Sequence, residues 1–210
     1  MNDIFLYHIT DIRNLENILR HQSILSKNRI DELKTGYINI AYEGIQDRRK
    51  IKAVPMKPSG NLHDYVPFYF APRSPMLYAI HTRQVEGYNE EQDSIIYLVI
   101  RLSKIVEYQL VYVYTDGHPI ISYTRFYNDL NQLNSVIDWD IMKAKYWHNT
   151  VEDGDRKRRR QAEFLIHQSV PFNLIEKIAI YDYGKAQQVK DSLTVFHQEV
   201  QVLIDHTWYY

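Results

Sequence analysis

The chain from 156 to 166 reads Arg156-Lys157-Arg158-Arg159-Arg160-Gln161-Ala162-Glu163-Phe164-Leu165-Ile166. A run of cations precedes a glutamate that begins an apolar segment, and such a segment predicts a strand. A charged carboxylate at the start of a buried strand is costly unless a partner or a reaction uses it. On a strand, Gln161 and Glu163 would point to the same face, where an amide and a carboxylate could grip a ribose. The alternative is an exposed glutamate paired with a neighbouring cation, which contributes only about 0–1 kcal/mol.

The remaining apolar patterns predict a single α+β domain over residues 1–210 with about six strands. Residues 94–102 form the clearest strand, because they are almost continuously apolar, as in a strand covered on both faces. Residues 65–70 also predict a strand, but Pro67 places it near an edge or an irregular junction. No repeat or domain boundary is present. Helices are expected over 41–50, 75–82, 125–133 and 184–197.

The composition is that of a globular protein, with 45% hydrophobic and 24% charged residues among 210. The absence of cysteine excludes disulfides and argues against a structural zinc site. Neither a long apolar run nor a signal-peptide pattern is present, so we expect a cytoplasmic protein with no membrane association and no metal. Net charge is −1, yet cations cluster over 48–57 and 156–160. The two clusters could line a groove for a polyanion, or they could be two solvated loops.

Two further stretches combine polar and aromatic side chains. His8 and Thr10 alternate at the end of a strand predicted for 4–7, so both could hydrogen-bond a ribose, an amide or a phosphate from one face. Residues 69–78 join aromatic surface to Arg73 and Ser74 at a helix start, which suits an anion and a planar heterocycle. A satisfied strand-end histidine and a tyrosine-rich core strand are the structural alternatives. Glycine-rich nucleotide fingerprints are absent, which argues against a Rossmann or P-loop site.

Four blocks of sequence carry a family likeness: Tyr7-His8-Ile9-Thr10, Ile45-Gln46-Asp47-Arg48-Arg49, His63-Asp64-Tyr65-Val66-Pro67-Phe68-Tyr69-Phe70-Ala71-Pro72-Arg73-Ser74-Pro75-Met76-Leu77-Tyr78 and Gln161-Ala162-Glu163-Phe164-Leu165. In this order, and spread over nearly the whole chain, they resemble the DarT family of bacterial toxins. Members are DNA ADP-ribosyltransferases paired with a macrodomain antitoxin, DarG. The long third block is the most specific, whereas the Gln-x-Glu spacing also occurs in transferases that modify protein side chains.

The resemblance implies an ADP-ribosyltransferase fold, with a central split and mostly antiparallel sheet flanked by helices. It implies NAD as a consumed co-substrate, Glu163 as the catalytic glutamate and Arg49 as the arginine that contacts the target base. The neighbouring Arg48 is the competing candidate for that arginine. The residues implied for NAD binding are His8, Thr10, Asn14, Tyr69, Arg73, Ser74 and Tyr78.

The implied reaction is ADP-ribosylation of a thymidine base in single-stranded DNA by the toxin of a toxin–antitoxin pair. A DarG-type macrodomain antitoxin would be its partner in the bacterial cytoplasm, and residues 147–162 would form a substrate-recognition loop. Two alternatives stay open: an acceptor that is guanine, RNA or a protein side chain, and a non-catalytic nucleic-acid-binding domain. The candidate DNA contacts are Arg48, Lys52, His118, Tyr123, Trp147, Arg158 and Arg159.

Overall fold

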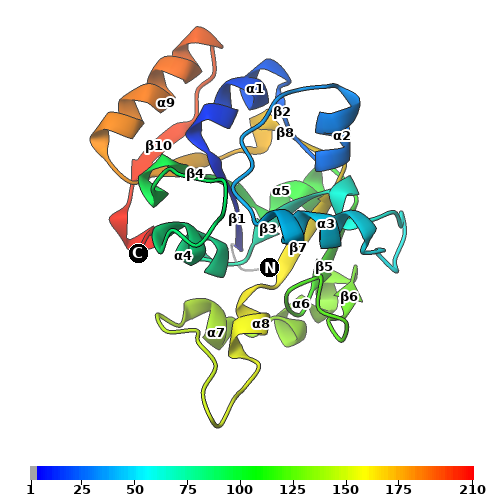
Figure 1. Cartoon of the computed structure of the whole chain (residues 1–210). Coiled ribbons are helices and arrows are strands. Elements are labelled where there is room, and N and C mark those ends of the chain that lie inside the picture. Colours follow the sequence, from blue (N-terminus) through cyan, green and yellow to red (C-terminus); the bar gives the residue numbers. More distant parts are fainter. Residues whose placement is uncertain (1–3) are drawn as a thin grey trace.

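A computed structural model describes residues 4–210, and its centre is one eight-stranded sheet (Figure 1). The strand order is β10-β9-β4-β1-β3-β7-β5-β6, and only β10 and β9 run parallel. A separate two-stranded sheet pairs β2 (Ser23–Leu25) with β8 (Ser169–Pro171). The strands of the large sheet are β1 (Phe5–Asp11), β3 (Tyr65–Tyr69), β4 (Ile95–Arg101), β5 (Tyr112–Thr115), β6 (Phe126–Tyr127), β7 (Glu163–His167), β9 (Lys177–Ile180) and β10 (Gln201–Ile204).

The sheet is split where β1 meets β3. Strand β1 pairs with β4 along its whole length, whereas its register with β3 is limited to Tyr7 opposite Tyr69. Pro67 has no N–H to donate to β1, and its carbonyl instead accepts a hydrogen bond from His8 Nδ1 at 2.8 Å. Pro67 predicted that β3 lies either at a sheet edge or at an irregular junction. Because β3 lies between β1 and β7, it is not an edge strand, and the irregular junction is correct.

Both faces of β4 are covered, as its apolar run predicts. Its residues from 95 to 100 are fully buried, and alternate side chains enter two different cores. One core contains the apolar sides of α1 (Leu15–Arg20) and α9 (Tyr183–Val195), and the other contains that of α4 (Pro75–His81). Helix α4 begins where predicted, because Ser74 Oγ accepts the N–H of Leu77 and a proline occupies the first turn.

The other helices are short and lie around the sheet (Figure 1). Helix α3 (Glu43–Ile51) forms close to its predicted position and carries three cations in its last turn, which suits the negative end of the helix dipole. The remaining helices are α2 (Lys27–Glu32), α5 (Leu102–Glu107), α6 (Leu133–Val136), α7 (Trp139–Lys143) and α8 (Arg156–Arg160).

Three sequence predictions are wrong. The helix expected over 125–133 is replaced by β6 and a short 3-10 helix at Leu130–Gln132, because Tyr127 pairs with Tyr114 of β5, with their rings stacked at 5.5 Å. Gln161 caps the end of α8 and donates to Lys157 O, so it does not share a strand face with Glu163. The strands outnumber the expected six, because β2, β6 and β8 are too short to give an alternating pattern.

The predicted fold class, α+β with a split, mostly antiparallel sheet flanked by helices, is confirmed. Within residues 4–210, no helix has both the length and the apolar character needed to cross a membrane.

Candidate active site

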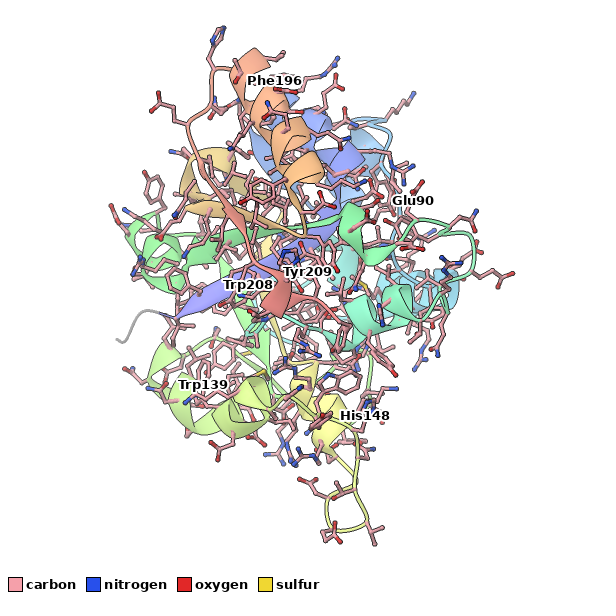
Figure 2. The ribbon with its side chains drawn as sticks, turned by 90° about the vertical axis from the view of Figure 1, so that its left-hand side faces the viewer. Glu90, Trp139, His148, Phe196, Trp208 and Tyr209 are labelled. Atoms are coloured by element: carbon pink, nitrogen blue, oxygen red, sulfur yellow. The ribbon has the colours of Figure 1, made fainter. Side chains whose placement is uncertain are left out.

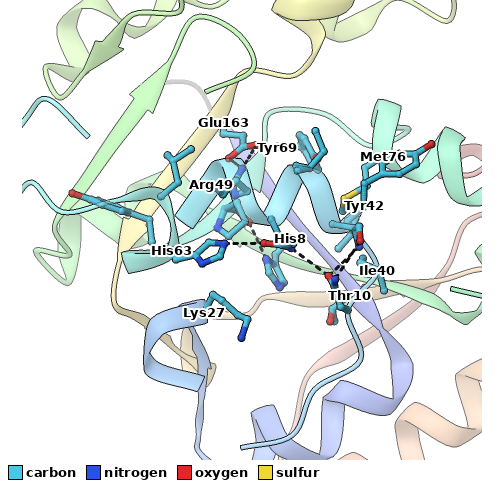
Figure 3. Close-up of a pocket in the computed structure, with 18 of the residues that line it drawn as sticks. His8, Thr10, Lys27, Ile40, Tyr42, Arg49, His63, Tyr69, Met76 and Glu163 are labelled. Carbon is cyan, nitrogen blue, oxygen red and sulfur yellow. Dashed lines mark hydrogen bonds and ion pairs between the residues drawn. The ribbon is translucent and has the colours of Figure 1, made fainter. Parts of the chain in front are cut away.

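A cavity of about 660 Å³ opens beside the split in the sheet. Its walls come from β1, β3, the start of β7, α3, the 35–42 loop, and residues near 120 and 147. Figure 3 shows the Arg49–Glu163 pair beside Tyr69, with His8 and Thr10 facing the same cavity. The sequence-predicted residues that line it are His8, Thr10, Asn14, Arg48, Arg49, Tyr69, Tyr78, His118, Trp147, Gln161 and Glu163.

Glu163 is fixed by the backbone at the first residue of β7, opposite Tyr69 of β3. Its N–H donates to Thr115 Oγ1 at 3.0 Å, and that hydroxyl donates to Gly117 O at 2.7 Å. Thr115 is fully buried and follows Tyr114, the last residue of β5 that pairs with β7, so its side chain continues the hydrogen bonding between these two strands. These contacts therefore fix the position of the Glu163 carboxylate at the edge of the split.

Arg49 reaches Glu163 from α3, across the mouth of the split. Its Nη1 lies 2.9 Å from Oε1 and 3.0 Å from Oε2, and the two residues are only 8% and 4% exposed. Arg49 Nη2 is buried and has no hydrogen-bond partner within residues 4–210. A buried guanidinium donor without a partner is costly, so this nitrogen is available to a ligand oxygen in the cavity.

Tyr69 supplies the wall next to the ion pair. Burial, together with the charge of Glu163, raises the pKa of its phenol, so the hydroxyl stays protonated at neutral pH. The hydroxyl can therefore donate a hydrogen bond while the ring offers an apolar face, a combination suited to a planar heterocycle.

His8 and Thr10 lie on β1, on the other side of the split from Glu163. Burial lowers the pKa of His8 to about 4, so the ring is neutral near pH 7. Its Nδ1–H donates to Pro67 O, which leaves Nε2 as an acceptor. Asn14 Nδ2 donates to Thr10 Oγ1 at 2.9 Å, and its side chain also exchanges two hydrogen bonds with the backbone of Ile38. Asn14 thus ties β1 to the 35–42 loop.

Cations make the mouth of the cavity electropositive. Arg48, Lys157 and His118 line it, in addition to Arg49. The pKa of His118 is lowered to about 3, mainly by burial and in addition by the positive charges of Arg49, Arg48 and Lys157. The histidine is therefore neutral at pH 7, and the surrounding positive potential favours a polyanion.

Aromatic rings also line the cavity. Trp147 is 2% exposed, and its ring lies edge-on to Tyr78 at 5.7 Å. The imidazole of His148, which also lines the cavity, lies 4.3 Å from the Trp147 ring. These rings give the cavity a wall on which a base could stack.

Two residues implied for NAD binding lie outside the lining. Arg73 has a positive φ of 56°, and its guanidinium lies 4.5 Å above the ring of Tyr210. Ser74 is 1% exposed and caps α4. Ser74 therefore supports the fold behind Tyr69, and Arg73 packs against another aromatic residue.

Four residues predicted to contact DNA also lie outside the lining. Arg158 is bound to Asp116 and Asp155 at 3.0 and 2.8 Å. Arg159 is paired with Asp138, Asp153 and Asp155. Tyr123 is 65% exposed and stacks on the Arg158 guanidinium, while Lys52 follows the end of α3. Two of the five cations in the run 156–160 thus form intramolecular ion pairs, which the sequence alone does not show.

His63 and Gln46 are lining residues to which the sequence analysis gave no role. His63 Nε2 donates to Gln46 Oε1 at 2.9 Å, and Gln46 Nε2 donates to Asn39 Oδ1 at 3.2 Å. This chain of hydrogen bonds connects α3, which carries Arg49, to the 35–42 loop. Both residues lie in the blocks 45–49 and 63–78, which carry the family likeness, so their place in these blocks could have identified them as site residues. No group of three or more metal-ligating side chains gathers anywhere in the described chain.

Comparison with known proteins connects this geometry to a family. The family model described as "ssDNA thymidine ADP-ribosyltransferase, DarT" matches residues 7–210. The chain belongs to the DarT family. A DNA ADP-ribosyl transferase from Thermus sp. (strain 2.9) is 40% identical over 207 residues, covering 98% of this chain and 95% of that DarT relative. The family resemblance predicted from the sequence is confirmed.

Solved DarT structures share the fold closely. Thermus sp. 2.9 DarT in complex with ADP-ribosylated ssDNA matches with a TM-score of 0.93 and 39% identity, covering 100% of this chain and 98% of that one. The same DarT in complex with NAD+ matches with a TM-score of 0.89 and 36% identity, covering 100% and 99%. A DNA ADP-ribosyl transferase-DNA ADP-ribosyl glycohydrolase fusion protein from Thermosipho africanus is 27% identical over 98% of this chain and 49% of the fusion.

Proposed function

We propose that this protein transfers ADP-ribose from NAD to a thymine base in single-stranded DNA. The observation that carries the proposal is the buried Arg49–Glu163 pair at the split of a DarT-family sheet, inside a cavity large enough for a dinucleotide. A carboxylate that binds a sugar cation and a guanidinium that binds a base carbonyl are the two charged groups this transfer needs.

On the NAD side, the neutral ring of His8 can accept a hydrogen bond from a ribose hydroxyl through Nε2, with Thr10 beside it. Tyr69 and Tyr78 offer faces to the nicotinamide ring, and Asn14 holds the loop that covers the adenosine half. Arg73 and Ser74 are left out of this proposal, because one packs on Tyr210 and the other caps α4.

Bond breaking at the ribose produces positive charge on C1′ and releases nicotinamide as a neutral molecule with the electrons of the C–N bond. The Glu163 carboxylate stabilises that charge electrostatically. A thymine ring nitrogen loses its imide proton to water and uses the electron pair of that N–H bond to form the new bond to C1′. Arg49 can stabilise, through Nη2, the negative charge that develops on the base carbonyl while the proton leaves and before the new bond is complete, because a guanidinium stays charged at every relevant pH.

The DNA strand approaches over the electropositive mouth. Arg48 and Lys157 neutralise phosphates there, His118 offers hydrogen bonds, and the rings of Trp147 and His148 provide a stacking surface. A duplex would have to flip its target base, which costs a few kcal/mol, so a single strand is the favoured substrate.

The wider role follows from the family. We infer that the protein acts as the toxin of a toxin–antitoxin pair in the bacterial cytoplasm, with a DarG-type macrodomain as its antitoxin. The fusion of a transferase with a glycohydrolase in Thermosipho africanus supports a partner that reverses the modification. A different acceptor, namely guanine, RNA or a protein side chain, is the competing proposal. A non-catalytic nucleic-acid-binding domain is disfavoured by the buried carboxylate, because a polyanion site gains nothing from it.

The test is incubation of the protein with NAD and oligonucleotides that differ by a single base, followed by mass spectrometry. We expect an increase of one ADP-ribose on strands that contain thymidine, and none on strands that lack it or in reactions without NAD. Modification of RNA or protein with every DNA strand unmodified would favour the competing acceptor. No NAD consumption with any acceptor would reject the catalytic proposal.

A further inference from the structure

An aromatic segment, Trp208-Tyr209-Tyr210, crosses the face of the molecule that carries α4 and the loop after α7. Figure 2 shows Trp208 and Tyr209 in the middle of this face and His148 below them. Three anchors hold the segment: Tyr97 Oη donates to Trp208 O at 2.8 Å, Tyr209 Oη donates to Ile95 O at 2.9 Å, and the buried side chain of Gln92 bonds the backbone of Tyr210.

Tyr210 joins this anchored segment to the wall of the cavity. Its hydroxyl accepts from Trp147 Nε1 at 2.8 Å and donates to Arg73 O at 2.6 Å. Its ring lies edge-on to Tyr78 at 5.0 Å and is stacked with His81 at 6.0 Å. Tyr210 does not line the cavity itself, so it can act only through these neighbours.

The dependence of Trp147 on this contact follows from its surroundings. Residues 144–155 form neither helix nor strand, so no backbone ladder fixes them between α7 and α8. The indole of Trp147 is almost fully buried, and a buried N–H needs an acceptor. The Tyr210 hydroxyl is that acceptor, and Trp147 in turn contacts His148. Loss of the hydroxyl therefore removes the hydrogen bond that orients the indole of Trp147, while Arg156 still holds the backbone carbonyls of residues 146 and 148.

We propose that Tyr210 is a positioning residue for the acceptor: its hydroxyl fixes the Trp147–His148 wall against which the nucleic acid binds. The proposal rests on the proposed transfer to single-stranded DNA and adds a residue that never touches either substrate. Tyr210 reaches the proposed NAD side through its ring, which contacts Tyr78, whereas its hydroxyl bonds Trp147. The contribution of the hydroxyl is thus on the acceptor side.

The variant Tyr210→Phe tests this, because it removes the hydroxyl and keeps the ring that contacts Tyr78. We expect KM for a thymidine oligonucleotide to rise about fivefold, as for the loss of one buried hydrogen bond. KM for NAD should stay within about twofold of the parent, since the NAD wall keeps all its contacts. The matched control is Tyr209→Phe, which removes a buried hydroxyl from the same segment but bonded to Ile95 O, away from the cavity. It should lower the melting temperature and leave both KM values unchanged.

A double-mutant cycle with Trp147→Phe removes the same hydrogen bond from the other side. If the bond carries the effect, the double variant binds the oligonucleotide about as well as either single variant. Equal KM values in Tyr210→Phe and the parent, equal rises for oligonucleotide and NAD, or strictly additive effects in the cycle would overturn the proposal. If Tyr210→Phe does not fold, an unchanged oligonucleotide KM in Trp147→Phe overturns it as well. A parent protein that modifies no oligonucleotide would instead reject the proposed function.

Discussion

Arg49 and Glu163, which are 114 residues apart in the sequence, form a buried ion pair with Nη1 2.9 Å from Oε1. The pair connects the two charged groups of the proposed reaction, the carboxylate that stabilises the sugar cation and the guanidinium that contacts the base carbonyl. Without substrates, each residue satisfies the charge of the other, which makes their burial possible. With substrates bound, the sugar cation and the base carbonyl become additional partners. The same contact thus stabilises the free protein and prepares the site.

Glu163→Gln removes the negative charge and keeps both the size and an acceptor for Arg49. We expect transfer to fall by about 10²–10³-fold, which is the usual cost of losing one preorganised electrostatic contact to a transition state. Oligonucleotide binding and the circular dichroism spectrum should be retained, because the side chain still fits its place. The rate is read from the mass of the oligonucleotide over time. A variant that modifies DNA at the parent rate would remove Glu163 from the mechanism.

Arg49→Ala and Arg49→Lys separate charge from geometry. In Arg49→Ala the buried carboxylate of Glu163 loses its cation and the base carbonyl loses its contact, so transfer to the base is lost. Arg49→Lys keeps one charge but cannot contact the carboxylate and a base carbonyl with separate nitrogens, so we expect partial activity. NAD binding, measured by calorimetry, should survive in both variants. If NAD affinity and base transfer decline to the same extent, Arg49 is an NAD contact instead.

Acid should destabilise the protein through its buried neutral histidines. His8 and His118 have pKa values lowered to about 4 and about 3, whereas an unfolded histidine titrates near 6.5. Between these values the unfolded state binds more protons, so stability is complete above pH 6.5 and is lost as pH falls towards 4. At pH 5.5 each histidine costs about 1.4 kcal/mol of unfolding free energy.

Urea unfolding at pH 7 and pH 5.5 measures this loss. His118→Asn should reduce the difference between the two pH values, and His197→Asn, at an exposed position, should leave it unchanged. A pH dependence that is identical in the parent and in His118→Asn would show that His118 is accessible to protons in the folded state.

The sequence predicts the parts of this protein that local pattern determines. The apolar run 95–100, the proline that interrupts β3 and the serine that caps α4 each give a correct element, because their causes lie within a few residues. Glu163 is identified for the same reason, since a carboxylate at the start of an apolar strand conflicts with its neighbours unless it has a special partner.

The partners themselves could not be read from the sequence. The basic run 156–160 illustrates this: its members have the same charge, yet Arg158 and Arg159 are bound to aspartates, while Lys157 faces the cavity. Which cations of the run are paired depends on the fold, because it brings Asp116 next to Arg158 and Asp138 next to Arg159. In the same way, the conformation of Arg73 and its contact with Tyr210 depend on a segment at the other end of the chain.

This difference within the basic run gives the last prediction. Lys157 lines the cavity and makes no ion pair with any residue from 4 to 210, so Lys157→Ala should weaken binding of single-stranded DNA and reduce the salt slope by about 0.7. Arg158→Ala breaks pairs with Asp116 and Asp155, so it should cost about 1.5–3 kcal/mol of stability and leave the slope unchanged. Fluorescence anisotropy with a labelled oligonucleotide from 50 to 200 mM salt, at a temperature where both variants are folded, measures the slopes. A slope that drops for Arg158→Ala but not for Lys157→Ala would mean that DNA opens the aspartate pairs and binds the arginine directly.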